Sequence, residues 1–143
     1  MGRVYNPDSA GKERNRLSRS VVLAIRQLMK QSEPDATSQD LAAFIALALL
    51  EIASTIDTSV TAWEKRGYWI KADRFRMEWA WSERLGKVMR QAVLEEDWAT
   101  IAVTSAQIAQ KLMSVEVPER HRLGEPWIGA WQALKKETQS TVH

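Results

Sequence analysis

The 143-residue sequence contains no cysteine and only two histidines, His121 and His143. Without cysteine the chain has no disulfide, thiolate nucleophile, iron–sulfur cluster or cysteine-ligated zinc site. Neither histidine belongs to an H-E-x-x-H or Glu-x-x-His motif, the patterns that helical zinc and di-iron sites use. We therefore expect no metal and no other cofactor.

Phosphate-binding and catalytic motifs are also missing. The sequence has no Walker motif and no G-x-G-x-x-G. Its one Glu-x-x-Glu, Glu116 with Glu119, has Pro118 inside it, so it is unsuited to a helical magnesium site. No motif combines a nucleophile, a base and an oxyanion donor, and the sequence favours a non-catalytic protein over an enzyme.

Long hydrophobic runs are scarce. The one uniformly apolar stretch is LAAFIALALL, residues 41–50, and Asp40 and Glu51 bracket it. A membrane span needs about 20 apolar residues, and the N-terminus lacks the apolar run of a secretory signal. We expect a soluble, cytoplasmic protein with no membrane contact.

The same stretch begins the helix that organises the chain. Apolar residues at helical spacing continue one stripe as far as Trp63, which predicts a central helix ending near Glu64. Thr37 and Asp40 have the spacing of a capping box at its start. Gly67 is expected to end it in a left-handed conformation.

Helical periodicity extends over most of the remaining chain, and alternating strand patterns are absent. The expected flanking helices run from Ser9 to about Gln31, from Ile70 to Val93, from Asp97 to Leu112 and, briefly, from Pro126. Met77 and Val88 are assigned to the apolar arc of the third helix, where Gly86 permits a close helix crossing. Thr104 is assigned to the outer face of the fourth helix.

The predicted fold is therefore all-α: an antiparallel bundle of four main helices plus a short C-terminal fifth helix. Residues 1–143 form one domain, in which residues 1–8 are an extended arm and residues 136–143 a frayed tail.

The back of the central helix raises the question of self-association. Phe44, Leu47 and Leu50 point away from the main apolar stripe, with Glu51 beside them. Either the fifth helix covers them, through Trp127 and Trp131, or a second chain does. Because the fifth helix is short and follows a long loop, the second chain is favoured. The leading hypothesis is a non-catalytic interaction or scaffold protein that forms a homodimer through these residues.

A small apolar or aromatic ligand is the alternative hypothesis. Arg74 and Glu78 are four residues apart inside the apolar arc of the third helix, where they are expected to pair. Trp69 and Trp79 fit the core stripes least well of the seven tryptophans, so they are the candidates to line a pocket or an interface with that pair.

A further alternative concerns the basic first helix. Residues 1–30 hold seven of the 20 basic residues and only two acidic ones. A stripe on this helix is a candidate anion-binding surface, formed by Lys12, Arg16, Arg19, Arg26 and Lys30. A solvated face is the plainer interpretation, and with a net charge of only +2 the sequence makes nucleic-acid binding unlikely.

Overall fold

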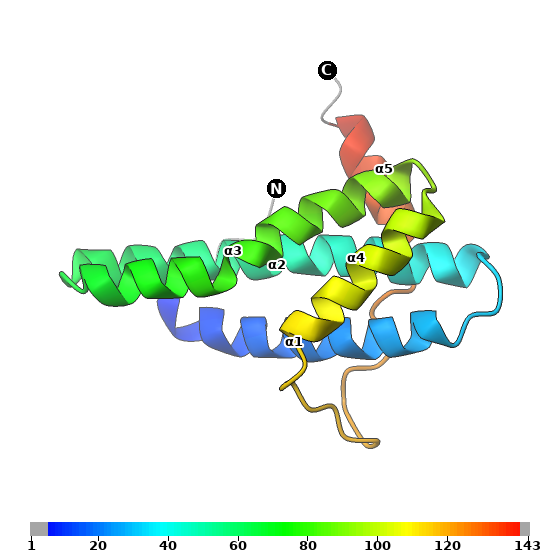
Figure 1. Ribbon diagram of the computed structural model, residues 1–143. Coiled ribbons are helices and arrows are strands. Elements are labelled where there is room, and N and C mark those ends of the chain that lie inside the picture. Colours follow the sequence, from blue (N-terminus) through cyan, green and yellow to red (C-terminus); the bar gives the residue numbers. More distant parts are fainter. Residues whose placement is uncertain (1–5, 141–143) are drawn as a thin grey trace.

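The computed structural model describes residues 6–140, and all regular structure in that range is helical. The helices are α1 (Pro7–Met29), α2 (Ala36–Lys65), α3 (Trp69–Leu94), α4 (Trp98–Lys111) and α5 (Ala130–Ser140). The predicted all-α bundle of four main helices and a short fifth is confirmed (Figure 1). Residues 1–5 of the predicted arm and 141–143 of the predicted tail lie outside the described residues.

Side-chain caps set where the first two helices begin. The Asn6 side chain accepts a 2.9 Å hydrogen bond from the Ser9 N–H, and Pro7 is the first helical residue, so α1 starts inside the predicted arm. Asp35 accepts a 2.9 Å bond from the Ser38 N–H and caps α2. The predicted capping box is therefore wrong, because the chain turns into the helix two residues before Thr37.

Asp40 has a different role. Its carboxylate accepts hydrogen bonds from the backbone N–H groups of Gly129 (3.2 Å) and Trp131 (2.9 Å), at the start of α5. Free N–H groups at a helix start favour a negative partner. α5 thus begins at Ala130 rather than Pro126, held by a side chain from α2, and it continues through part of the predicted tail to Ser140.

α2 is the central helix of the bundle. α1, α3 and α5 all pack against it (Figure 1). Leu41, Ile45, Leu49 and Ile52 are completely buried. By length and composition alone α2 could cross a membrane, but other parts of the chain bury more than half of its most apolar window, as in the core helix of a soluble protein.

The back of α2 is covered within the chain. Trp127, Ala130 and Leu134 from the C-terminal segment belong to the main core, and Phe44 and Leu47 pack half-buried against that core. α5 packs against α2, so the fifth helix supplies a covering within the chain, one of the two considered for this face. The argument that a second chain must cover Phe44 and Leu47 therefore no longer holds, although dimerisation itself stays a prediction.

α3 crosses α2 closely at Gly86, as predicted. A Cβ built on Gly86 would lie 3.2 Å from the Leu49 Cβ and 3.1 Å from the Leu50 Cδ2. The assignment of Met77 and Val88 to the apolar arc of this helix is wrong, since both side chains are exposed. α3 changes direction partway along its length (Figure 1), and a single straight helical wheel therefore misplaces residues on it.

We predict that Gly86→Ala lowers the free energy of unfolding by about 1–3 kcal/mol, because the added methyl group would lie too close to the Leu49 and Leu50 side chains of α2. Gly11→Ala is the matched control within α1. A Cβ there meets only the Arg14 Nη2 at 3.7 Å, so the gain in helix propensity should stabilise by about 0.5–1 kcal/mol. Urea denaturation measures both; equal effects at the two sites would contradict the close crossing.

We also predict that Asp40→Ala loosens α5. Loss of a capping side chain typically costs about 0.5–2 kcal/mol, and Asp40→Asn should cost less because it keeps one acceptor oxygen. Hydrogen exchange should show faster exchange of amides in α5 while those at the centre of α2 and α3 stay protected. Uniform acceleration along the chain would instead indicate that α5 does not open independently.

Candidate functional site

The free end of the α2–α3 hairpin reaches beyond the other helices (Figure 1). Its turn is closed by hydrogen bonds from the Tyr68 N–H to the Trp63 carbonyl (2.9 Å) and from the Gly67 N–H to the Glu64 carbonyl (3.0 Å). This pair of bonds is the Schellman motif, and Gly67 supplies its left-handed residue with φ +80°. The predicted helix end is confirmed, and it fixes the orientation of the residues that follow.

Three consecutive apolar or aromatic side chains are presented at this end. Tyr68 is 54% exposed, Trp69 59% and Ile70 71%. Large apolar side chains scattered singly over a surface need no explanation, but a contiguous group marks an interaction site. We refer to Lys65–Arg74 as the hairpin tip.

The hairpin tip is basic. Lys65, Arg66, Lys71 and Arg74 are exposed there, and Asp73 is the one acidic residue among residues 65–74. Asp73 is already engaged by Arg76, at 2.8 Å. Arg76 also bonds Glu64 at 3.0 Å, and these carboxylates raise the pKa of Arg76 above its ordinary value. The outward charge of the tip is therefore positive.

An aromatic cluster supports the hairpin behind its tip. Trp63 and Phe75 meet edge to face at 4.9 Å between ring centroids, Phe75 lies 6.4 Å from Trp79, and Trp79 stacks on Trp81 at 5.7 Å. Pairs in such geometries add to the stabilisation that burial gives. The cluster joins the main core, to which Trp81 belongs, with the smaller cluster of buried residues that Trp63 and Phe75 contact.

Arg14 of α1 joins this cluster. Its Nη1 donates to the Thr55 carbonyl (3.4 Å), the Thr55 Oγ1 (3.3 Å) and the Ser59 Oγ (3.4 Å). The guanidinium lies 4.7 Å from the Phe75 ring centroid. Burial lowers the pKa of Arg14, and the nearby Glu78 carboxylate opposes that effect. Arg14 thus ties α1 to both helices of the hairpin.

Sequence reasoning missed Arg14, although a signal was present. Arg14 is three residues before Leu17 and seven before Val21, both buried, so it occupies the apolar stripe of α1 rather than the basic one. A lone cation on an apolar stripe next to a tryptophan-rich hairpin indicates a buried guanidinium packed on aromatic rings.

The predicted ligand residues are only partly brought together. Arg74 and Glu78 are exposed and not within the apolar arc, and no ion pair joins them in the part of the chain that the structure describes. They line a shallow hollow of about 340 Å³ with Trp63 and Phe75. Trp69 lines the neighbouring surface at the tip, while Trp79 is packed in the aromatic cluster. The expectation of a buried pair was wrong because the bend of α3 turns this face outward.

The basic stripe of α1 is largely a solvated face. Lys12, Arg19, Arg26 and Lys30 are exposed, whereas Arg16 forms an ion pair with Glu13. Arg26 donates to the Val117 carbonyl at 3.3 Å. Anion binding by this stripe stays a prediction.

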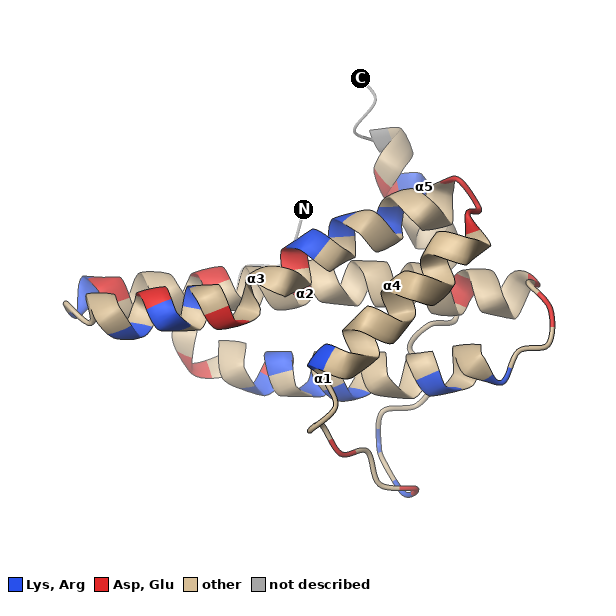
Figure 2. Cartoon of the chain, in the orientation of Figure 1, with Lys and Arg blue, Asp and Glu red and all other residues tan. Residues whose placement is uncertain are grey.

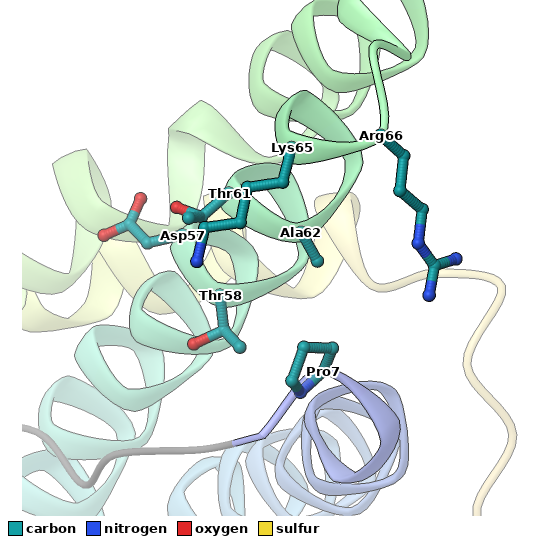
Figure 3. A pocket seen from close by; sticks show the side chains of 7 residues that line it. All are labelled: Pro7, Asp57, Thr58, Thr61, Ala62, Lys65 and Arg66. Carbon is teal, nitrogen blue, oxygen red and sulfur yellow. The ribbon is translucent and has the colours of Figure 1, made fainter.

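A hollow of about 550 Å³ lies between the start of α1 and the last turns of α2 (Figure 3). It is lined by Pro7, Asp57, Thr58, Thr61, Ala62, Lys65 and Arg66. Burial raises the pKa of Asp57, Glu83 adds to that effect and Arg76 opposes it. Asp57 and Arg66 lie toward opposite sides of the hollow, so its lining does not select a ligand of one charge.

The outer face of α4 is a second exposed surface. Figure 2 shows that α4 carries charge only at its end. Thr104 is buried, which corrects its predicted place on the outer face, and Ala102 is exposed instead. The outward residues of α4 are Ala99, Ala102, Val103, Ala106, Gln107, Gln110 and the terminal Lys111, and Met113 is exposed just beyond the helix. This face is more apolar than predicted.

Across residues 6–140 no group of three or more histidine or acidic side chains is placed to hold a metal ion. Within the same range the hairpin tip and the α4 face are the two surfaces whose composition departs most from an ordinary solvated one.

We predict that Arg14→Met lowers the free energy of unfolding by about 1–3 kcal/mol, through lost hydrogen bonds and cation–π contact. Arg14→Lys should recover less than half of this loss, since an ammonium group lacks the planar fork. Arg19→Met is the matched control: Arg19 is exposed on the same helix, so the change should stay within about 0.5 kcal/mol. Urea midpoints that are equal for the Arg14 and Arg19 variants would refute the structural role of Arg14.

A function for this chain is therefore argued from the hairpin tip and the α4 face described above. No family model, curated protein or solved structure matches it.

Proposed function

We propose that this chain is a non-catalytic interaction protein that self-associates, and that the outer face of α4 forms the contact between copies. The observation that carries the proposal is the lack of charge on this exposed face. From Trp98 to Gln110 no residue is charged.

An uncharged exposed helix face is unusual on a monomer. Soluble surfaces normally carry about 25–35% charged residues. Centres of protein–protein interfaces are depleted in charge and enriched in methionine. Val103 on α4 is 60% exposed, and Met113, just beyond the end of this helix, is 81% exposed. Covering these side chains would remove apolar surface from water at no cost in desolvated charge.

A second copy of the chain is the partner that this face fits. In a two-fold contact the same surface meets itself, so any net charge on it would repel its counterpart. From Trp98 to Gln110 the α4 face avoids that repulsion, and its one charged residue, the exposed Lys111, lies at the end of the helix. Its small residues, Ala99, Ala102 and Ala106, would also let two helices approach closely. This placement replaces the back of α2, which α5 covers.

The proposal is supported by what the chain lacks for catalysis. The cysteine-free sequence offers no thiolate, and His121, the one histidine in the described range, lies in the loop between α4 and α5. The hydrogen bond from the Leu123 N–H to the His121 Nδ1 is local to that loop. Nothing nearby would make His121 part of a nucleophile–base pair.

We expect a dimer in the micromolar range by sedimentation equilibrium and light scattering. Val103→Glu and Ala106→Glu should each weaken the dimer about tenfold to a hundredfold, because each buries a charge against its symmetry copy. Both positions are exposed, so the variants should keep the helix content and melting temperature of the wild type.

Ala80→Glu is the matched control, since Ala80 is an exposed alanine within α3. It should leave the association unchanged. A wild-type protein that stays monomeric through the micromolar range, or α4 variants that dimerise like the wild type, would reject the proposal. If Phe44→Glu alone produced monomers, the contact between copies would lie at the back of α2 instead.

A further inference from the structure

We propose that the hairpin tip docks on the surface of an anionic lipid bilayer, as a peripheral contact in which Tyr68, Trp69 and Ile70 enter the headgroup region. This inference goes beyond self-association and does not depend on it. It also revises the expectation of no membrane contact, which rested on the absence of a spanning segment.

The apolar part of the tip fits the membrane interface. Tyrosine and tryptophan combine an apolar ring with a polar group, and they favour the level of the lipid headgroups. Ile70 beside them is purely apolar and more exposed than either. Together these consecutive residues offer a small apolar surface that water hydrates poorly and the acyl boundary accepts.

The charge of the tip selects the type of bilayer. Lys65, Arg66, Lys71 and Arg74 surround the apolar residues, and the carboxylate of Asp73 is held by Arg76. Lysine and arginine can place their charged groups in the headgroup layer while the methylene groups of their side chains cover apolar surface. Each such residue near an anionic surface contributes attraction. A neutral bilayer would not provide this electrostatic attraction.

The shape of the molecule lets a flat surface reach the tip. The hairpin end extends past α1, α4 and α5, so a plane can touch it without meeting the rest of the bundle (Figure 1). The tip is also held firmly. The Schellman turn closes it, and the ring of Trp63, which receives the Lys71 Nζ at 4.5 Å, belongs to the aromatic cluster behind it.

Other anionic partners use these features less completely. A nucleic acid would stack bases on Tyr68 and Trp69 but gains nothing from the aliphatic side chain of Ile70. An acidic peptide is usually bound in a groove that holds its side chains, whereas the tip projects. A bilayer uses the apolar residues, the cations and the projecting shape together.

The test is co-sedimentation of the full chain with vesicles made of equal parts phosphatidylcholine and phosphatidylserine. We expect binding to these vesicles, weakened by high salt, and none to pure phosphatidylcholine. Ile70→Ala and Trp69→Ala should each lower the partition coefficient about tenfold. Lys65→Gln should lower it about fivefold, the equivalent of one lost cation near the surface.

Matched controls are present in the chain. Ile128 is 69% exposed, close to Ile70, so Ile128→Ala controls for loss of an exposed isoleucine. Lys87→Gln controls for loss of an exposed lysine on α3 away from the hairpin tip. Neither should alter partitioning, and all variants should melt like the wild type. Brominated lipids should quench the fluorescence of the wild type more than that of Trp69→Phe.

Each opposite result overturns the proposal. Absence of binding to the phosphatidylserine vesicles does so directly, and so does binding that the tip variants leave intact. Fluorescence anisotropy with oligo(dT) and with poly-glutamate completes the test. Tight, tip-dependent binding to either probe without vesicle binding would reassign the tip to nucleic acid or to an acidic protein segment.

Discussion

The structure depends on covering one helix that is apolar almost all round. The first half of α2 contains ten consecutive apolar residues, 41–50, so no single neighbour can remove it from water. α1 and α3 pack along it, and α5 returns from the far end of the sequence to close the remaining side. The bundle is therefore organised around one central helix rather than around a symmetric set of four.

The main core surrounds only the N-terminal half of α2. Nearer the C-terminal end of α2, a separate small cluster of buried residues is built on Ile56, Val60 and Ala72. The aromatic cluster and Arg14 lie at this level. Aromatic rings are wide enough to fill the space that a further helix would occupy, and the guanidinium satisfies polar groups of α2 while packing on a ring. At the projecting hairpin, these large side chains fill the space that another helix would otherwise occupy.

Sequence periodicity predicted what is decided locally. The number and order of the helices, the turn at Gly67 and the close crossing at Gly86 follow from spacing, glycine and short-range hydrogen bonds. Trp69 was identified as a candidate contact residue because it fits the core stripes poorly, and it is exposed at the tip. The turn at Gly67 depends on residues within a few positions of one another, whereas the crossing at Gly86 joins α3 to Leu49 and Leu50 of α2 and was indicated by the glycine alone.

Features decided by distant parts of the chain escaped prediction. Asp40 was read as a local cap, but its partners are about ninety residues away, at Gly129 and Trp131. The exposure of Met77, Arg74 and Glu78 follows from a bend in α3 that a regular helical wheel does not contain. The outer face of α4 was misassigned at Thr104 because the direction from which α3 and α1 approach it is a property of the whole bundle.

The contact between Asp40 and α5 has a consequence for the growing polypeptide. The side of α2 that α5 covers is made long before its cover, with 91 residues separating Asp40 from Trp131. At about 5–20 residues per second, translation leaves that apolar side without its cover for roughly 5–18 seconds. During this interval the early part of α2 cannot make the contacts with α5 that it has in the folded chain.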